Sequence, residues 1–158
     1  MNRECNVCNN LSGSKNIFKE SRIYDGKYWA VEHAYPCKIK GWLVLILKNH
    51  KEQLHELNES EFKEFSELVQ ILTKSIYKET NCGKEYLIFC SDSYGKGFDH
   101  LHAHLIGRPK SLAIEKKGGK IFELIKINEK DSISKKELIL FSNKFKKTLN
   151  NNQKKWRD

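Results

Sequence analysis

The sequence has no long apolar segment and no apolar leader at its N-terminus. A membrane-spanning helix needs about 18 or more consecutive apolar residues, and no stretch of the chain approaches that length. The opening residues, Met-Asn-Arg-Glu-Cys-Asn, lack the apolar run of a secretory signal. These absences predict a cytoplasmic protein without a membrane span.

The cysteine content argues against a disulfide framework. The chain has 5 cysteines, an odd number, and disulfide-rich domains are typically secreted with paired cysteines. Cys5 and Cys8 form a C-x-x-C pair, a spacing found in metal sites and in redox pairs. Cys37, Cys82 and Cys90 are isolated, and we expect them to act as small buried apolar residues.

The positive charge is concentrated in the last third of the chain. The 158 residues suffice for one domain with a hydrophobic core but not for two. Of the net charge of +9, +8 lies from Pro109 to Asp158, where 14 Lys and Arg face 6 Asp and Glu. Such a region attracts polyphosphates, nucleic acids or acidic partners. We favour a solvated lysine-rich surface, because aromatic residues do not interleave with these lysines as in a single-strand nucleic-acid binder.

Short apolar runs predict β-strands on either side of one long helical segment. The expected strands are residues 17–20, 28–32, 41–47, 86–90 and 100–106. The run 41–47 is apolar almost throughout, which is typical of a central strand. Strands, a long helix and two further strands indicate an α+β fold with a mostly antiparallel sheet.

The long helix has recognisable ends. Asn58 and Glu61 form a capping box at its start, and apolar residues then recur at spacings of three and four. Asn81 and Gly83 are typical of a helix C-terminus. The pattern predicts a helix from Glu59 to Thr80.

The pattern is weaker beyond Pro109. Residues 120–127 are apolar enough for a short strand or a short helix. Ser134 and Glu137 resemble a second capping box and predict a helix through about Leu149. We expect residues 150–155 to be frayed or disordered.

The chemistry of the sequence is concentrated in three alternating histidines. His100, His102 and His104 would project from one face of a strand, because side chains alternate along β structure. Three imidazoles on one face make a poor core. They suit metal binding, nucleophilic attack or acid–base chemistry, because imidazole titrates near neutral pH.

At this point the sequence resembles a known family. The segment His100–Ile106, His-Leu-His-Ala-His-Leu-Ile, is similar at every position to the motif His-φ-His-φ-His-φ-φ of the histidine triad (HIT) family, where φ is apolar. The apolar run 41–47 leading into Lys48-Asn-His50 also resembles the family, as does the Leu57–Glu61 entry to the long helix.

The resemblance covers about residues 5–109 and implies a HIT-like fold. That fold is α+β, with a mostly antiparallel five-stranded sheet and a long helix, here with an additional C-terminal helix. We therefore expect residues 1–109 to form the histidine triad core and residues 110–158 a basic extension packed on the same domain.

The resemblance also implies an enzymatic mechanism. His102 would attack the α-phosphate of a dinucleoside polyphosphate or related nucleotide, and water would hydrolyse the covalent nucleotidyl-histidine. A neutral imidazole is a suitable nucleophile for such a two-step reaction. His104 would contact phosphate oxygens as the second catalytic residue. Two alternatives stay open: a nucleotidyltransferase with an acceptor other than water, and a nucleotide-binding module with little turnover.

A metal site is implied by one branch of the family. The zinc-bearing bacterial-type branch, and the related galactose-1-phosphate uridylyltransferases, hold zinc with a C-x-x-C pair and two histidines. The matching residues here are Cys5, Cys8, His50 and His100. Two thiolates and two imidazoles make a closed, structural zinc site. A catalytic metal bound by the three triad histidines is the alternative, but it leaves the cysteine pair without a role.

The sequence departs from the family around the expected substrate. Many members have Gln and Ser or Thr shortly before the first triad histidine, where Lys96 and Gly97 stand here. Lys96 is a candidate phosphate contact, with a solvated loop lysine as the alternative. The ribose-binding Asp of many members corresponds to His33 or Ala34, so His33 is a further candidate for substrate binding. The family also implies a homodimer.

Overall fold

One antiparallel sheet organises the molecule. The structure, a computed structural model, describes residues 5–12, 19–91, 99–125 and 127–157. Five strands lie in the order β1-β2-β3-β5-β4. They are β1 (Arg22–Asp25), β2 (Trp29–His33), β3 (Trp42–Leu47), β4 (Lys84–Cys90) and β5 (His102–Arg108). The α+β fold with a five-stranded antiparallel sheet predicted from the sequence is confirmed.

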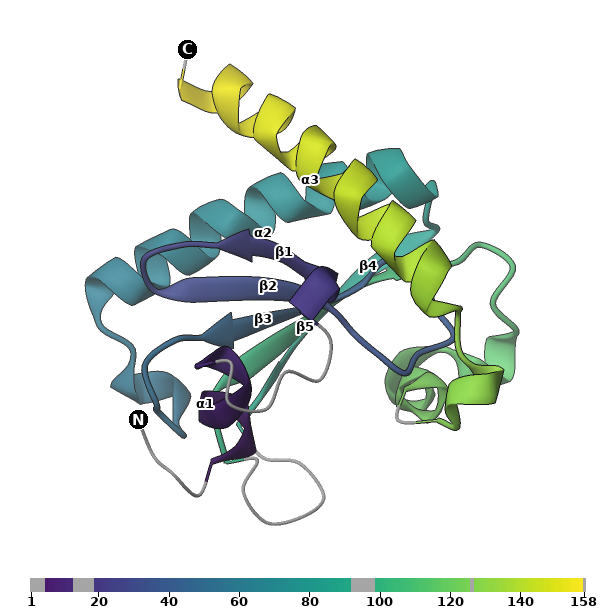
Figure 1. Cartoon of the computed structure of the whole chain (residues 1–158), viewed down its shortest axis with the longest axis horizontal. Coiled ribbons are helices and arrows are strands. Elements are labelled where there is room, and N and C mark those ends of the chain that lie inside the picture. Colours follow the sequence, from purple (N-terminus) through teal and green to yellow (C-terminus); the bar gives the residue numbers. More distant parts are fainter. Residues whose placement is uncertain (1–4, 13–18, 92–98, 126, 158) are drawn as a thin grey trace.

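Helices cover the sheet unequally on its two sides. The α-helices are α1 (Asn6–Leu11), α2 (Glu59–Thr80) and α3 (Lys135–Arg157). The 3-10 helices are η1 (Lys19–Ser21), η2 (Leu54–Glu56), η3 (Ile114–Lys116), η4 (Gly118–Leu124) and η5 (Glu129–Asp131). The long helices α2 and α3 lie on one side of the sheet, whereas α1 and the short helices after β5 lie toward the other (Figure 1). Across the described residues, no helix is both long enough and apolar enough to cross a membrane.

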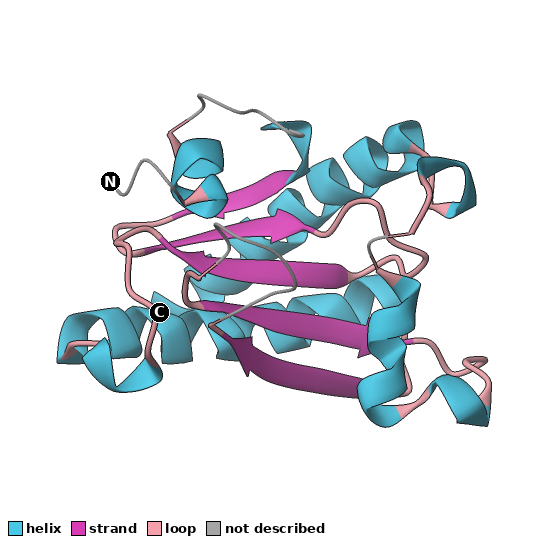
Figure 2. Ribbon diagram, turned by 90° about the horizontal axis from the view of Figure 1, so that it is seen from below, coloured by secondary structure: helices cyan, strands magenta, loops and turns pink. Residues whose placement is uncertain are grey.

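The central strand β3 separates two hydrophobic clusters. Leu43, Leu45 and Leu47 are fully buried on the face that packs against α2. Trp42 and Val44 belong to a second cluster on the opposite face, which is turned toward the viewer in Figure 2 with the long helices behind the strands. Burial on both faces explains why this strand is apolar at nearly every position.

The long helix α2 begins and ends where the sequence predicts. Asn58 accepts a hydrogen bond from the Glu61 amide, and the Glu61 side chain accepts one from the Asn58 amide. Asn81 adopts a left-handed conformation with φ of 49°, which Asn tolerates better than most residues. At the start of β3, Gly41 has φ of 91°, and a Cβ there would lie 2.8 Å from Cγ2 of Thr80. Close packing of α2 on the sheet therefore requires glycine at this position.

The C-terminal third packs on the core through backbone and side-chain contacts. The Lys38 amide donates to the Leu124 carbonyl, and the Ile133 amide donates to the Cys37 carbonyl. On α3, Thr148 donates to Glu79 of α2 at 2.6 Å. These contacts attach the middle of the extension to the loop between β2 and β3, and α3 to α2.

Two sequence predictions differ from the structure. Lys19 and Glu20 lie in η1 and not in a strand, and β1 starts only at Arg22; residues 17 and 18 lie outside the described part of the chain. Residues 150–155 are helical and not frayed, because α3 continues to Arg157. Within the apolar stretch 120–127, η4 accounts for the segment up to Leu124, and the predicted capping box at Ser134 is present.

Candidate functional site

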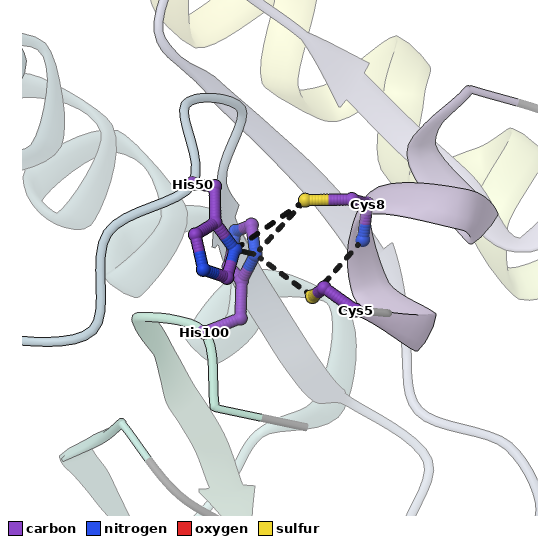
Figure 3. Close-up of side chains that lie close together, drawn as sticks. All are labelled: Cys5, Cys8, His50 and His100. Carbon is purple, nitrogen blue, oxygen red and sulfur yellow. Dashed lines mark hydrogen bonds between the residues drawn. The ribbon is translucent and has the colours of Figure 1, made fainter. Parts of the chain in front are cut away.

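Four side chains from three separate segments of the chain meet beside the end of β3. Cys5 and Cys8 come from the start of α1, His50 from the turn after β3, and His100 from just before β5 (Figure 3). Their ligand atoms lie within 4.8 Å of one another. Cys5, Cys8 and His100 are buried, and His50 is partly buried. The structure therefore brings together all four residues of the metal set expected from the sequence.

The distances within this group fit a tetrahedral metal ion. Zinc bonds of about 2.3 Å to sulfur and 2.05 Å to nitrogen place tetrahedral S and N ligands about 3.6 Å apart and two N ligands about 3.3 Å apart. Nδ1 of His100 lies 3.5 Å from Sγ of Cys5 and 3.6 Å from Sγ of Cys8. Nδ1 of His50 lies 3.5 Å from Sγ of Cys8 and 3.3 Å from Nδ1 of His100. The donor set thus has the spacing of a closed S₂N₂ site.

The outer ring nitrogens are also arranged for metal binding. Nε2 of His100 donates to the Leu47 carbonyl at 2.6 Å, and Nε2 of His50 lies 3.2 Å from a carboxylate oxygen of Glu52. A proton on each Nε2 leaves a lone pair on each Nδ1, which faces the sulfur atoms. Burial lowers the pKa of His100, and this favours the neutral ring that a metal requires.

A buried carboxylate holds the turn that carries His50. Glu61 is 0% exposed and accepts hydrogen bonds from Lys51 at 2.6 Å and Asn49 at 2.9 Å. Burial acts to raise the pKa of Glu61, but its hydrogen bonds outweigh burial and hold the pKa below its ordinary value. The residue that caps α2 therefore also fixes the turn beside the four-residue group.

A second group lies where β4 and β5 pair, on the face of the sheet opposite α2, which we call the outer face. Ligand atoms of Cys90, His102 and His104 lie within 4.8 Å of one another. The rings of His102 and His104 meet edge to face, with centroids 5.1 Å apart. The alternation expected over residues 100–106 starts only at His102, because His100 precedes β5 and its ring belongs to the first group. The three histidines are thus divided between two adjacent sites.

The backbone of His100 determines which nitrogen of His102 carries the proton. Nδ1 of His102 lies 2.8 Å from the His100 carbonyl oxygen. A carbonyl oxygen only accepts, so Nδ1 carries the proton and Nε2 of the neutral ring carries the lone pair. A lone pair on Nε2 is the requirement for nucleophilic attack by this side chain.

The structure places His33 apart from the triad. This side chain is 2% exposed; its Nε2 accepts from the Gly41 amide and its Nδ1 donates to the Ala34 carbonyl. Its ring also packs edge-on against Phe141 of α3. Both ring nitrogens hold the loop between β2 and β3, and His33 has no place in the function proposed below. Lys96 and Gly97 lie outside the described residues.

The burial of His33 predicts a pH-dependent stability. Burial lowers its pKa to about 4 from 6.5, so below pH 6.5 the unfolded chain binds a proton that the folded chain does not. The free energy of unfolding should therefore fall as the pH drops from 6.5 toward 4, with about 2 kcal/mol lost by pH 5. Denaturant titrations at several pH values should show a shallower fall for His33→Gln than for the parent protein.

The group formed by Cys5, Cys8, His50 and His100 should affect the pH dependence of stability equally in both proteins. The difference between their pH slopes therefore isolates His33. The same change at the exposed His55 is the matched control and should leave the pH dependence unaltered. Equal pH slopes for His33→Gln and the parent would contradict the assignment.

Two aromatic residues beside His104 carried no functional signal in the sequence. The indole Nε1 of Trp42 donates to Nδ1 of His104 at 2.9 Å. Phe122 of η4 meets the His104 ring edge to face at 5.2 Å. The position of Trp42 on the outer face of β3 follows from strand alternation, but the contribution of η4 depends on how the extension folds back.

The sequence motif and this geometry agree with a comparison against known families. The HIT domain family model matches residues 16–111, more than half of the chain. The chain belongs to the HIT family. No curated protein sequence matches this HIT protein significantly.

Solved structures share the fold of this HIT protein at low sequence identity. A hypothetical histidine triad nucleotide-binding protein from Sulfolobus tokodaii has a TM-score of 0.68 and 17% identity, over 93% of each chain. A Zn-bound histidine triad family protein from Mycobacterium smegmatis has a TM-score of 0.65 and 14% identity, over 93% of this chain and 96% of the other. Plasmodium falciparum diadenosine triphosphate hydrolase, in complex with cyclomarin A, has a TM-score of 0.61 and 20% identity, over 85% and 80%.

Proposed function

We propose that this HIT protein is a nucleotidyl hydrolase that cleaves a dinucleoside polyphosphate or a related nucleotide at its α-phosphate. The observation that carries the proposal is the 2.8 Å hydrogen bond from Nδ1 of His102 to the His100 carbonyl. It leaves the lone pair on Nε2, on the outer face of the sheet beside His104. The similarity in fold to a diadenosine triphosphate hydrolase supports the same substrate class.

In the first step, Nε2 of His102 attacks the α-phosphorus. An N–P bond forms, and the bond from phosphorus to the leaving-group oxygen breaks with its electron pair on that oxygen. The His100 carbonyl stabilises the positive charge that develops on the ring, because it accepts the Nδ1 proton of His102. His104 contacts the phosphate oxygens in this mechanism.

In the second step, a water oxygen attacks the same phosphorus. The N–P bond breaks, its electron pair returns to Nε2 of His102, and the nucleoside monophosphate leaves. The proton from the attacking water passes to solvent. His102 thereby regains the tautomer in which it started, and the enzyme is ready for the next turnover.

The four-residue group is proposed as a structural zinc site. Cys5, Cys8, His50 and His100 would hold the ion, and a four-ligand site leaves no position for a water nucleophile. Zinc would supply a fixed crosslink between α1, the turn after β3 and the chain entering β5. His100 would then be anchored by its ring while its carbonyl orients His102. The similar fold of a Zn-bound histidine triad protein supports this assignment.

Trapping of the covalent intermediate tests the proposed activity. The panel contains diadenosine polyphosphates, an adenosine phosphoramidate and a nucleotide sugar, each labelled with ³²P at the α-phosphate. Because acid cleaves a histidine N–P bond, the reaction is quenched rapidly with alkaline detergent. We expect this quench to capture labelled protein with one substrate, with the label on His102 by peptide mapping at alkaline pH. Release of a nucleoside monophosphate into water defines a hydrolase, whereas release only after addition of phosphate or a sugar phosphate defines a transferase.

The same experiment identifies a binding module. Nucleotide binding by calorimetry, with neither trapped label nor turnover across the panel, would contradict the enzymatic proposal.

A further inference from the structure

Trp42 and His104 form a cross-strand pair on the outer face of the sheet. They lie on neighbouring strands at a diagonal, because Trp42 faces Ile106 and His104 faces Val44 in the antiparallel register. Trp42 is 0% exposed and His104 is 8% exposed. The indole Nε1 lies 2.9 Å from Nδ1 of His104. This is a buried hydrogen bond between the central strand and a member of the triad.

The bond allows only one protonation state of His104. An indole N–H can donate but cannot accept, so Nδ1 of His104 must carry a lone pair. A ring protonated on both nitrogens, or on Nδ1 alone, would place a second hydrogen against the indole hydrogen. The neutral ring that accepts from Trp42 therefore carries its proton on Nε2. His104 consequently has the tautomer opposite to that of His102.

Aromatic contacts fix the plane of the same ring. Trp42 meets His104 edge to face at a centroid distance of 5.8 Å, and Phe122 does so at 5.2 Å. Phe122 also packs against Trp42, at 5.4 Å. Phe122 belongs to η4, so the C-terminal extension supplies part of this support. The tautomer and the orientation of His104 are thus both determined by residues outside the triad.

We propose that Trp42 is a positioning residue that fixes His104 as an Nε2–H donor to the substrate phosphate. The inference rests on the proposed nucleotidyl transfer, for which it names the group that makes His104 a hydrogen-bond donor. A proton on Nε2 can donate to a phosphate oxygen, whereas a lone pair there would repel it. Two neighbouring histidines thereby have opposite roles: the His100 carbonyl makes His102 a nucleophile, and Trp42 makes His104 a donor.

The Trp42–His104 hydrogen bond also opposes metal binding by the group of Cys90, His102 and His104. Cys90, His102 and His104 have the composition and spacing of a site for a soft cation such as Zn²⁺. His104 has no lone pair on Nε2 while Trp42 donates to Nδ1, so it cannot act as a ligand through that nitrogen. Trp42 therefore protects the nucleophile from the metal that we propose for the adjacent group.

Replacement of the indole N–H alone tests the proposal. Site-specific incorporation of β-(3-benzothienyl)alanine at position 42 exchanges N–H for sulfur in a ring of nearly the same shape. Trp29 is the matched control, because its indole is also fully buried but donates to the Glu61 carbonyl on the α2 side. Both proteins are compared with the full-length parent after confirmation of equal zinc content and cooperative unfolding.

Three results are expected at position 42 and not at position 29. Nitrogen-15 NMR of the His104 side chain should lose the single Nε2–H tautomer. The affinity for AMP and kcat should each fall about tenfold, the effect of one neutral hydrogen bond. Excess Zn²⁺ should inhibit the position-42 variant at concentrations about tenfold lower than the parent, because the hydrogen bond that keeps the proton on Nε2 of His104 is lost. A loss of folding stability alone would not produce this combination.

An unchanged Nε2–H tautomer in the position-42 variant would overturn the proposal, as would unchanged AMP affinity. These readouts do not depend on turnover. If the parent protein cleaves no nucleotide, the proposed function fails, and the tautomer and the AMP affinity still decide the role of Trp42. Trp42→Phe is the second variant, with the same expectations for NMR and AMP binding.

Discussion

Replacement of His102 by alanine is expected to lower kcat/KM for the preferred nucleotide at least about a hundredfold, or about 2.7 kcal/mol of transition-state stabilisation. The physical reason is the loss of the proposed nucleophile. His102 donates from Nδ1 to the His100 carbonyl, which leaves the lone pair on its Nε2 beside His104. Without the nucleophile, water must displace the leaving group in one step. Steady-state kinetics with the substrate found in the trapping panel provide the measurement.

Folding should be almost unaffected by this change. His102 is partly exposed, and the hydrogen bond from its Nδ1 to the His100 carbonyl is worth about 1 kcal/mol. The matched control is His55→Ala, an exposed histidine in η2, for which kcat/KM should equal that of the parent. His102→Ala should also give no acid-labile, alkali-stable label in the trapping experiment. Turnover within tenfold of the parent would exclude His102 as the nucleophile.

Replacement of Cys8 by serine is expected to lower the free energy of unfolding by more than about 4 kcal/mol, as in proteins that lose a structural metal. Cys8 is 1% exposed, and its sulfur lies 3.5 Å from Nδ1 of His50 and 3.6 Å from Nδ1 of His100. A metal would stabilise the folded chain selectively, because only folding brings the Cys5–Cys8 pair to His50 and His100. Denaturant titration and elemental analysis of tag-free protein provide the measurements.

The parent should contain about one zinc per chain, and Cys8→Ser much less. The matched control is Cys82→Ser, which makes the same chemical change at another buried cysteine outside the group. A chelator should destabilise the parent and the Cys82 variant but have little further effect on Cys8→Ser. Absence of metal from gently purified parent protein, together with insensitivity to the chelator, would contradict a structural zinc.

Metal removal should also reduce turnover indirectly. His100 contributes its ring to the proposed metal site and its carbonyl to the Nδ1 proton of His102. Loss of the metal would free the chain that precedes β5 and with it the acceptor that selects the His102 tautomer. The two groups therefore meet at His100, and we expect loss of the metal to lower both the stability and the turnover.

The sequence alone determined the elements whose signals are local. The capping box at Asn58 and the three-and-four spacing that follows fixed the limits of α2, because helix ends depend on side chains within one turn. The apolar run of β3 marked the central strand. The resemblance of residues His100–Ile106 to the HIT motif also depends only on neighbouring residues, and the family match confirms it.

Only the tertiary structure decided the protonation and partners of the histidines. Which nitrogen carries the proton depends on the atom opposite it, and these atoms come from distant residues: Trp42 for His104 and Leu47 for His100. The interior role of His33 and the approach of Phe122 to the triad likewise follow from packing between segments. Local patterns specify which residues can do chemistry, whereas three-dimensional contacts select the atom that does it.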